Sequence, residues 1–316
     1  QPSFGGINLE DISQPKCFEV LDRLRDSLSI PVWHDDQQGT ATVVVAALRN
    51  ALEIVQKSMR EVRIVLVGIG AANMAVYRLL ASAGADPGRV LACDRGGILH
   101  AGRRDIELQQ DRFPDKWRVC LESNADRRTG DVADALRGAD VVLAFSSPGP
   151  DTIAPEWVAA MADDAVVFAC ANPTPEIWPW VATEAGARVV ATGRSDFPNQ
   201  VNNSLGFPGI FRGVLDVRAR RITDEMALAA AEVLAGFARR RGLDHGLLPT
   251  MAEWEVVPEI AAATGGEAQR QGLARLDTTP ELLAERARRM IVDARRATEL
   301  LFAEGIIPPP PAATST

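Results

Sequence analysis

The chain has 316 residues, of which 47% are hydrophobic and 24% are charged, and its formal net charge is -8. This composition is typical of a soluble globular protein, and the negative charge argues against nucleic acid or a membrane surface as the main partner. No apolar run is long enough to form a membrane-spanning helix. The four cysteines lack CxxC or Cys/His spacing, so we expect neither a zinc site nor disulfides, and we expect a reducing, cytoplasmic location.

Short strands and helices alternate along most of the chain. Residues 17–28 have apolar side chains at helical spacing, residues 29–33 form a short buried strand, and residues 40–56 form a largely apolar helix. Further apolar strands are predicted at residues 63–68, 89–94, 139–146, 164–173 and 187–193, with helical segments between them. Apolar strands separated by helices are typical of a parallel sheet that is covered on both faces. We therefore predict an α/β protein with a Rossmann-like, doubly wound parallel sheet.

The C-terminal part of the chain is predicted to be helical. Residues 223–241 form a helix that opens on a threonine cap, and residues 279–304 form another that opens on a Thr-Pro pair. We interpret the Phe-Pro-Gly sequence at 207–209 as a turn ahead of these helices. The proline-rich end, residues 307–316, is predicted to be a flexible tail.

Gly68 and Gly70 lie between a predicted strand and a predicted helix. Glycines at such a turn let the backbone approach a pyrophosphate, which then sits against the N–H groups at the helix start. Asp94 ends the next strand, about 20 residues on, where an acid binds the adenosine ribose. The neighbouring arginine could instead meet a 2′-phosphate, so NAD is favoured but NADP stays open. The candidate cofactor-binding residues are Gly68, Gly70, Ala71, Asn73 (which replaces the third glycine of the fingerprint), Asp94, Arg95 and Asn172. The alternative is a doubly wound sheet that binds no nucleotide.

Two pairs of adjacent acids lie near the start of the chain. Glu10 and Asp11 form the first pair, and Asp35 and Asp36 form the second. Carboxylates on loops suit a hard divalent ion such as Mg²⁺ or Mn²⁺, which prefers oxygen ligands. The second pair could instead cap the helix that follows, because acids are favoured at a helix N-terminus. Both interpretations stay open on spacing alone.

Three asparagines lie near predicted strand ends. Asn172 follows one strand, and Asn202 and Asn203 follow another. Ligands of open α/β sheets collect at the carboxyl ends of the strands, so the three are candidate neutral donors to a substrate carboxylate or a carboxamide. Each of them alone could equally be an ordinary turn residue.

The motifs "FGGINLEDI", "IPVWHDDQQGTA", "VGIGAAN", "ANPTPEI" and "TGRSDFPNQVNNSLGFPGIFRG" occur in this order. In this the chain resembles the malic enzyme family, the NAD(P)-dependent decarboxylating malate dehydrogenases, and in particular its bacterial branch. The resemblance implies a metal-dependent oxidation of malate to pyruvate and CO₂ with reduction of NAD or NADP. It also implies Mg²⁺ or Mn²⁺ as the metal and a homodimer or larger assembly.

The resemblance also implies roles for single residues. Glu10, Asp11 and Asp36 match the metal-binding acids, and Asp35 matches an acid that orients a catalytic lysine. Asn172, Asn202 and Asn203 match residues near the substrate and the nicotinamide.

The family's N-terminal tyrosine and lysine motifs are not found in this sequence. Tyr77 lies inside a predicted helix, where packing is its expected role, and Lys16 is expected at the surface. The chain starts where that region would end, so we expect a truncated protein.

The resulting domain prediction has four parts. Residues 1–60 are a metal and substrate segment left from a truncated second domain, residues 61–215 are the dinucleotide-binding domain, residues 216–306 are C-terminal helices, and residues 307–316 are the tail. Two other functions stay open. The chain could be a complete lyase or dehydrogenase for another 2-hydroxy or 2-oxo acid, or a non-catalytic nucleotide-binding module.

Overall fold

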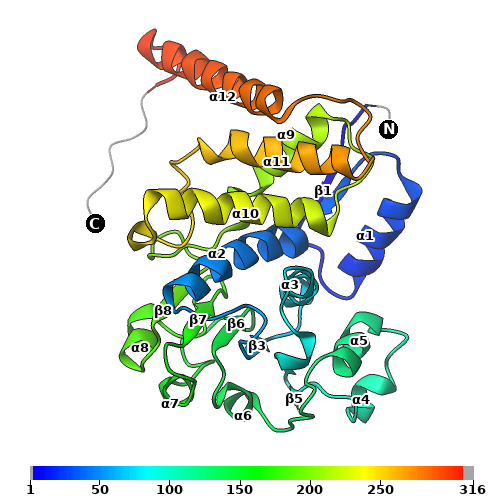
Figure 1. The fold of residues 1–316 in the computed structure, drawn as a ribbon, viewed down its shortest axis with the longest axis vertical. Coiled ribbons are helices and arrows are strands. Elements are labelled where there is room, and N and C mark those ends of the chain that lie inside the picture. Colours follow the sequence, from blue (N-terminus) through cyan, green and yellow to red (C-terminus); the bar gives the residue numbers. More distant parts are fainter. Residues whose placement is uncertain (1–2, 309–316) are drawn as a thin grey trace.

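A mixed six-stranded sheet forms the lower half of the molecule in the computed structural model, which describes residues 3–308 (Figure 1). Its strand order is β5-β4-β3-β6-β7-β8. The strands are β3 (Ile64–Val67), β4 (Val90–Asp94), β5 (Gly97–Ile98), β6 (Val141–Ala144), β7 (Val166–Ala169) and β8 (Val189–Thr192). All of them run parallel except the edge strand β5, which pairs antiparallel with β4 and was not predicted. The predicted Rossmann-like sheet is thus confirmed, with one added edge strand.

Helices cover both faces of this sheet (Figure 1). Along β3, Ile64 and Leu66 belong to one apolar core, and Val65 and Val67 belong to the other. The first face is covered by α2 (Thr40–Ile54), α3 (Ala71–Ser82) and α5 (Pro114–Glu122), and the second by α6 (Val132–Leu136), α7 (Pro155–Ala159) and α8 (Pro179–Glu184). Successive strand residues point to opposite faces, so a strand between two helical layers must be apolar throughout. This is why the strands lack polar alternation.

Further helices stack above α2 (Figure 1). They are α9 (Phe207–Asp216), α10 (Asp224–Arg241), α11 (Val256–Arg270) and α12 (Pro280–Ala303). α10 packs on α2 and on α11, and α11 packs on α9 and α12. The predicted threonine caps are confirmed, because Thr223 and Thr279 each accept a backbone N–H from the first turn of the helix that follows. The interpretation of 207–209 as a turn was wrong. These residues open α9, because proline fits the first turn of a helix.

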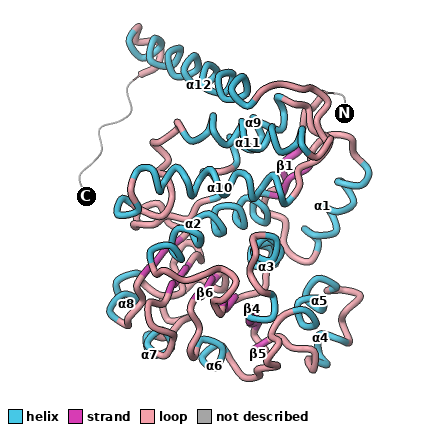
Figure 2. The backbone as a smooth tube through the Cα atoms, viewed as in Figure 1, coloured by secondary structure: helices cyan, strands magenta, loops and turns pink. Residues whose placement is uncertain are grey.

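A second, small sheet lies near the N-terminus. In it β1 (Ile7–Leu9) pairs in parallel with β2 (Val32–His34), and α1 (Lys16–Ser27) connects them. The tube view in Figure 2 shows β1 near the N-terminus, well apart from the main sheet. The strand β1 was not predicted. The remaining short elements are α4 (Arg104–Glu107), the π-helical turn Asp35–Gly39 and the 3₁₀ turns Pro87–Arg89, Asn203–Leu205 and Leu243–His245.

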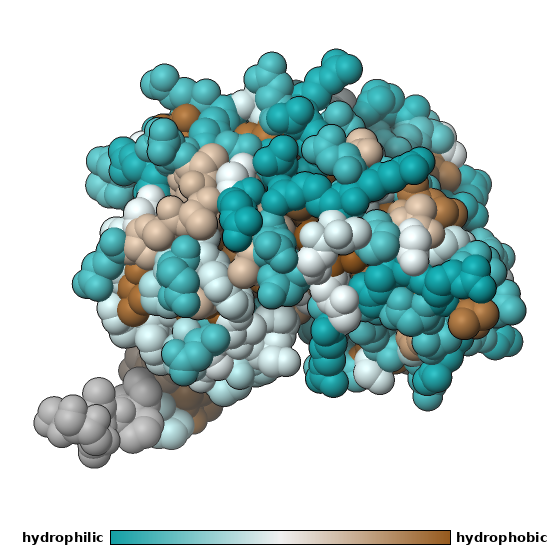
Figure 3. Space-filling model, turned by 90° about the horizontal axis from the view of Figure 1, so that it is seen from below, coloured by the Kyte–Doolittle hydropathy of each residue, from teal (hydrophilic) through white to brown (hydrophobic). Residues whose placement is uncertain are grey.

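One face of the molecule is largely hydrophilic (Figure 3), and the cysteines are buried. The face seen in Figure 3 is covered mainly by hydrophilic residues, with small apolar areas between them. No helix within residues 3–308 combines the length and apolarity needed to cross a membrane. All four cysteines are buried free thiols. Most of the predicted tail, residues 309–316, lies outside the described residues.

Candidate dinucleotide-binding and active site

The glycine loop lies at the point where the sheet changes winding direction. β3 leads into α3 on one face, whereas β6 leads toward α7 on the other, and a crevice outside the carboxyl ends of two such strands is the usual ligand site. Gly68 has a φ of 81°, and a Cβ added there would lie 2.6 Å from the Phe145 carbonyl oxygen at the end of β6. Gly70 and Ala71 then open α3. Only glycine suits position 68, because it combines a positive φ with close backbone contact.

Asn73 stabilises this loop through hydrogen bonds to the backbone. Its side chain is fully buried, and Nδ2 donates to the carbonyl oxygens of Val67 (3.1 Å), Gly68 (2.7 Å) and Leu143 (3.2 Å). These bonds tie the glycine loop to β6. Its amide nitrogen is therefore engaged by the loop backbone, and the direct contact of Asn73 with a cofactor stays a prediction.

Asp94 lies at the end of β4, as predicted, but its carboxylate already has partners. It accepts hydrogen bonds from Arg103 (3.0 Å), from Lys116 and from the backbone N–H of Gly96 (2.8 Å). Burial alone would raise the pKa of Asp94, but the hydrogen bonds from Arg103 and Lys116 outweigh burial and lower it. The carboxylate therefore stays ionised. Arg95 beside it is exposed to solvent.

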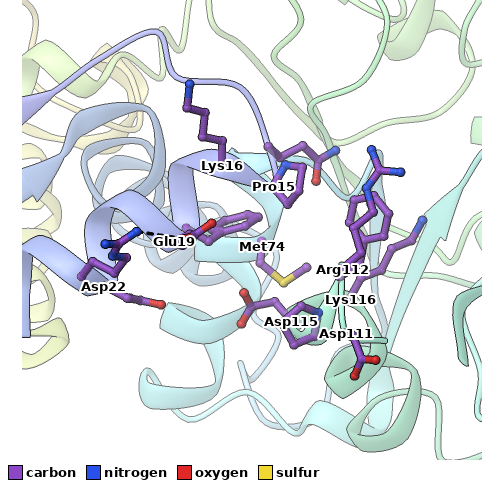
Figure 4. Close-up of a pocket in the computed structure, with 14 residues that line it drawn as sticks. Pro15, Lys16, Glu19, Asp22, Met74, Asp111, Arg112, Asp115 and Lys116 are labelled. Atoms are coloured by element: carbon purple, nitrogen blue, oxygen red, sulfur yellow. Dashed lines mark hydrogen bonds and ion pairs between the residues drawn. The ribbon is translucent and has the colours of Figure 1, made fainter. Parts of the chain in front are cut away.

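Lys116 also lines a cavity of about 480 Å³ between α1 and the start of α5 (Figure 4). Met74 of α3 forms part of its floor, and Pro15 and Arg112 lie around it. The sequence analysis did not single out Lys116, although lysine is rare in this chain. Lys116 therefore connects this cavity to Asp94, the predicted ribose-binding acid, because its ammonium group donates a hydrogen bond to Asp94.

The two acidic pairs meet at one end of the small sheet. Leu9 of β1 pairs with His34 of β2, so Glu10 and Asp11 leave the sheet beside Asp35 and Asp36. The backbone N–H of Asp11 donates to Asp36 Oδ2 at 2.9 Å. Within the described residues, however, no group of three or more His, Cys, Asp or Glu side chains is arranged to hold a metal ion. The predicted metal-binding acids are therefore neighbours, but their side chains do not converge.

Asp35 connects this acidic edge to the asparagines. Its buried carboxylate accepts hydrogen bonds from Trp33 Nε1 at 3.0 Å and from Asn203 Nδ2 at 2.8 Å, across 168 residues of chain. Burial raises the pKa of Asp35 to about 6; the nearby carboxylates of Glu10 and Asp36 act in the same direction, and the Trp33 bond opposes them. The second acidic pair does not cap α2, because no side-chain cap bond is found at its start or at that of the turn before it.

The three asparagines do not play equivalent parts. Asn172, which follows β7, and Asn202 both line a cavity of about 660 Å³ at the carboxyl edge of the sheet, together with Gly193. Asn202 Oδ1 accepts the N–H of Ser204 at 2.9 Å, so its amide nitrogen is the group left to face a ligand. Asn203 is turned toward Asp35. The structure thus brings two of the three predicted substrate-binding asparagines to one cavity.

The two residues considered as proton donor or base lie elsewhere. Lys16 is exposed at the start of α1. Tyr77 is buried in α3, and burial raises the pKa of its hydroxyl well above the usual value. Neither residue belongs to the cavity that Asn172 and Asn202 line.

A doubly wound sheet with a glycine loop at its switch point and an acid on the next strand defines a dinucleotide-binding protein of the dehydrogenase type. Comparison with known proteins identifies the family. The family described as "Malic enzyme, NAD binding domain" matches residues 37–268. The chain belongs to the malic enzyme family, as its motifs predicted.

Curated relatives support this assignment. The chain is 43% identical to a bifunctional malic/malolactic enzyme of Bacillus subtilis, over 92% of this chain and 69% of that protein. It is 46% identical to an NAD-dependent malic enzyme of Geobacillus stearothermophilus, over 88% of this chain and 56% of that protein. It is also 43% identical to an NADP-dependent malic enzyme of Halomonas elongata, over 86% of this chain and 66% of that protein. The chain therefore spans only part of the length of these relatives.

Solved structures agree. The malic enzyme of Entamoeba histolytica superposes with a TM-score of 0.94 at 48% identity, over 98% of this chain and 63% of that one. The malic enzyme of Pyrococcus horikoshii superposes with a TM-score of 0.88 at 44% identity, over 96% of this chain and 70% of that one.

Proposed function

We propose that this chain supplies the dinucleotide-binding half of an active site that oxidises malate with NAD or NADP and then decarboxylates the product. The observation that carries the proposal is the hydrogen bond between Asn203 and Asp35. It joins the acidic edge of the small sheet to the asparagines at the carboxyl edge of the main sheet. This bond supports a single site to which the acidic pairs and the asparagines both contribute.

The residues suit this chemistry. The glycine loop and the start of α3 present backbone N–H groups to a pyrophosphate. A dinucleotide bound there would accept a hydride from C2 of malate while the C2 hydroxyl gives up its proton, and the resulting 2-oxo acid would lose CO₂ to leave an enolate that takes up a proton. Asn172 and Asn202 offer amide groups at the cavity, and neutral donors bind a substrate carboxylate without introducing a further charge.

A divalent ion, Mg²⁺ or Mn²⁺, is part of this proposal. Glu10, Asp11 and Asp36 supply the oxygen donors that such ions prefer, but these donors do not converge in the structure. Glu10 and Asp11 are exposed, so rotation of their side chains would be needed to complete a site. Bound there, the ion would supply Lewis-acid polarisation of the substrate oxygen.

We expect Asp36→Asn to weaken Mn²⁺ binding strongly, because the variant keeps an oxygen that accepts the Asp11 N–H but loses the charge. Loss of even an outer partner of a metal site costs about ten- to a hundredfold in affinity, so a ligand should cost at least as much. Calorimetric titration with Mn²⁺ measures this. The control is Asp26→Asn, which removes an exposed acid from α1. Equal Mn²⁺ affinity in both variants would exclude Asp36 as a ligand.

We expect Gly68→Ala to weaken binding of NAD and NADP by roughly tenfold or more, because its Cβ would displace the Phe145 carbonyl from the loop. Gly84→Ala is the matched control. Gly84 also has a positive φ, 99°, but a Cβ there meets nothing within 4 Å. Both variants carry backbone strain, and only the first should lose dinucleotide affinity. Equal losses would show that strain alone, and not the loop contact, is responsible.

The whole function is tested by following malate-dependent formation of NADH or NADPH with Mn²⁺, using the complete gene product. Turnover supports the proposal, and its absence with a folded, metal-loaded protein rejects it. Dinucleotide binding without turnover of any 2-hydroxy acid would favour a non-catalytic nucleotide-binding module. The homodimer or larger assembly and the cytoplasmic location stay predictions.

A further inference from the structure

Glu176 is a fully buried carboxylate at the carboxyl edge of the main sheet, and the sequence analysis gave it no role. Its Oε1 accepts the backbone N–H of Ser146 at 2.7 Å and the hydroxyl of Ser146 at 3.0 Å. Its Oε2 accepts the backbone N–H of Ala171 at 3.0 Å. No salt bridge to Glu176 is found within residues 3–308. A buried charge without a cation is costly unless hydrogen bonds stabilise it, so these three bonds are what hold it there.

The two partners of Glu176 lie on different strand ends. Ser146 follows β6, and Ala171 follows β7. The last paired residues of these strands are Ala144 and Ala169, so the carboxylate bridges the two chains just beyond the end of the ladder. The backbone carbonyl of Glu176 also accepts the N–H of Ile153, at 3.0 Å. One residue therefore holds the loop after β6 against the loop after β7.

Each loop carries a residue of the candidate site. On one side, the Phe145 carbonyl that precedes Ser146 packs against Gly68, the first glycine of the cofactor loop. On the other side, Asn172 directly follows Ala171, and its amide nitrogen packs against Gly193, where an added Cβ would lie 3.2 Å away. Through its two oxygens, Glu176 thus sets the distance between the cofactor loop and Asn172.

We propose that Glu176 is a positioning residue for the nicotinamide half of the bound dinucleotide. It holds Asn172 at a fixed distance from the glycine loop, so that the adenosine half and the nicotinamide half of one dinucleotide can bind at the same time. This inference rests on the proposed dinucleotide binding. It assigns Glu176 no contact with substrate or cofactor.

A carboxylate is needed at position 176 because both of its oxygens accept hydrogen bonds. Glutamine has the same length but only one accepting oxygen. Ser146 presents two donors and Ala171 only one, so in Glu176→Gln we expect the accepting oxygen to stay with Ser146 and the amide nitrogen to face the Ala171 N–H, which then loses its partner. An unpaired buried donor is costly enough to shift the loop, and we expect affinity for the intact dinucleotide to fall about tenfold. A ligand that occupies only the adenosine side should not sense the change.

The test compares two probes on wild type, Glu176→Gln and the control Glu184→Gln, which removes an exposed carboxylate from α8. The first probe is NADH or NADPH, whichever wild type binds more tightly, and the second is the matching adenosine fragment, ADP or adenosine 2′,5′-bisphosphate. We expect Glu176→Gln to lose affinity for the intact dinucleotide about tenfold and to bind the fragment like wild type. The control should match wild type for both probes.

Equal losses for both probes, or no loss for either, would overturn the inference, since a merely structural role does not separate the two halves of the ligand. If wild type binds neither probe, the proposed function itself falls, and the inference falls with it. If Glu176→Gln does not fold, Glu176→Asp takes its place. Aspartate keeps the charge but is one methylene shorter, so it cannot reach both partners, and the same split between the probes is expected.

Discussion

Replacing Gly213 by alanine should lower the free energy of unfolding by about 3 kcal/mol. Gly213 lies where α9 crosses α11, and a Cβ added there would lie 2.3 Å from the Ala261 carbonyl oxygen and 2.3 Å from Thr264 Oγ1. The carbonyl belongs to the backbone of α11, so no side-chain rotation relieves the contact. At Gly209, one turn earlier, an added Cβ would lie 2.5 Å from Ile260 Cβ. The two helices can approach only because both positions lack a side chain.

Urea unfolding measures this effect, and Gly266→Ala is its control. Gly266 lies on α11 itself, but a Cβ there meets no atom within 4 Å. Alanine in a helix interior is favoured over glycine, so this variant should gain about 0.5 to 1 kcal/mol. The two substitutions are chemically identical and should change stability in opposite directions. A loss in both variants would show that contact between α9 and α11 is not the cause.

The same helix pair shows why part of the fold escaped prediction. The strands of the main sheet other than β5, and the helices α2, α3, α10 and α12, were predicted, because apolar runs and helix caps are local signals. The helix α9 was interpreted as a turn at its start, because Phe-Pro-Gly is a common turn sequence. Its glycines have a packing role that depends on α11, more than 40 residues later, and no local pattern reports a partner so far away.

Some residues of the candidate site could likewise be predicted from the sequence, and others could not. Gly68 and Asp94 were found because their spacing along the chain determines their place at the sheet edge. Glu176 was not found, because a glutamate in a loop is expected to be exposed, and its burial depends on donors from two separate strand ends. The partners of Asp35 were likewise missed. Trp33 is close in sequence, but Asn203 reaches Asp35 only through the fold.

Asp35 should make the folded protein less stable as the pH rises from about 4 to 7. Burial raises its pKa from 3.8 to about 6, so within this range the folded state binds a proton that the unfolded state has released. The stabilisation from neutral Asp35 is complete below pH 3.8 and is lost as the pH rises through about 6. A shift of this size corresponds to about 2 to 3 kcal/mol.

Asp35→Asn isolates this effect, because asparagine does not titrate. Its carbonyl oxygen can accept the Trp33 N–H, and its amide can donate to Asn203 once that side chain turns its oxygen inward. The measurement is urea unfolding of wild type and variant from pH 4 to 7, in EDTA so that no metal ion binds the neighbouring acids. Relative to the variant, wild type should lose about 2 to 3 kcal/mol across this range. Parallel curves would show that Asp35 is ionised already at pH 4, and its burial would then be balanced by the Trp33 and Asn203 hydrogen bonds alone.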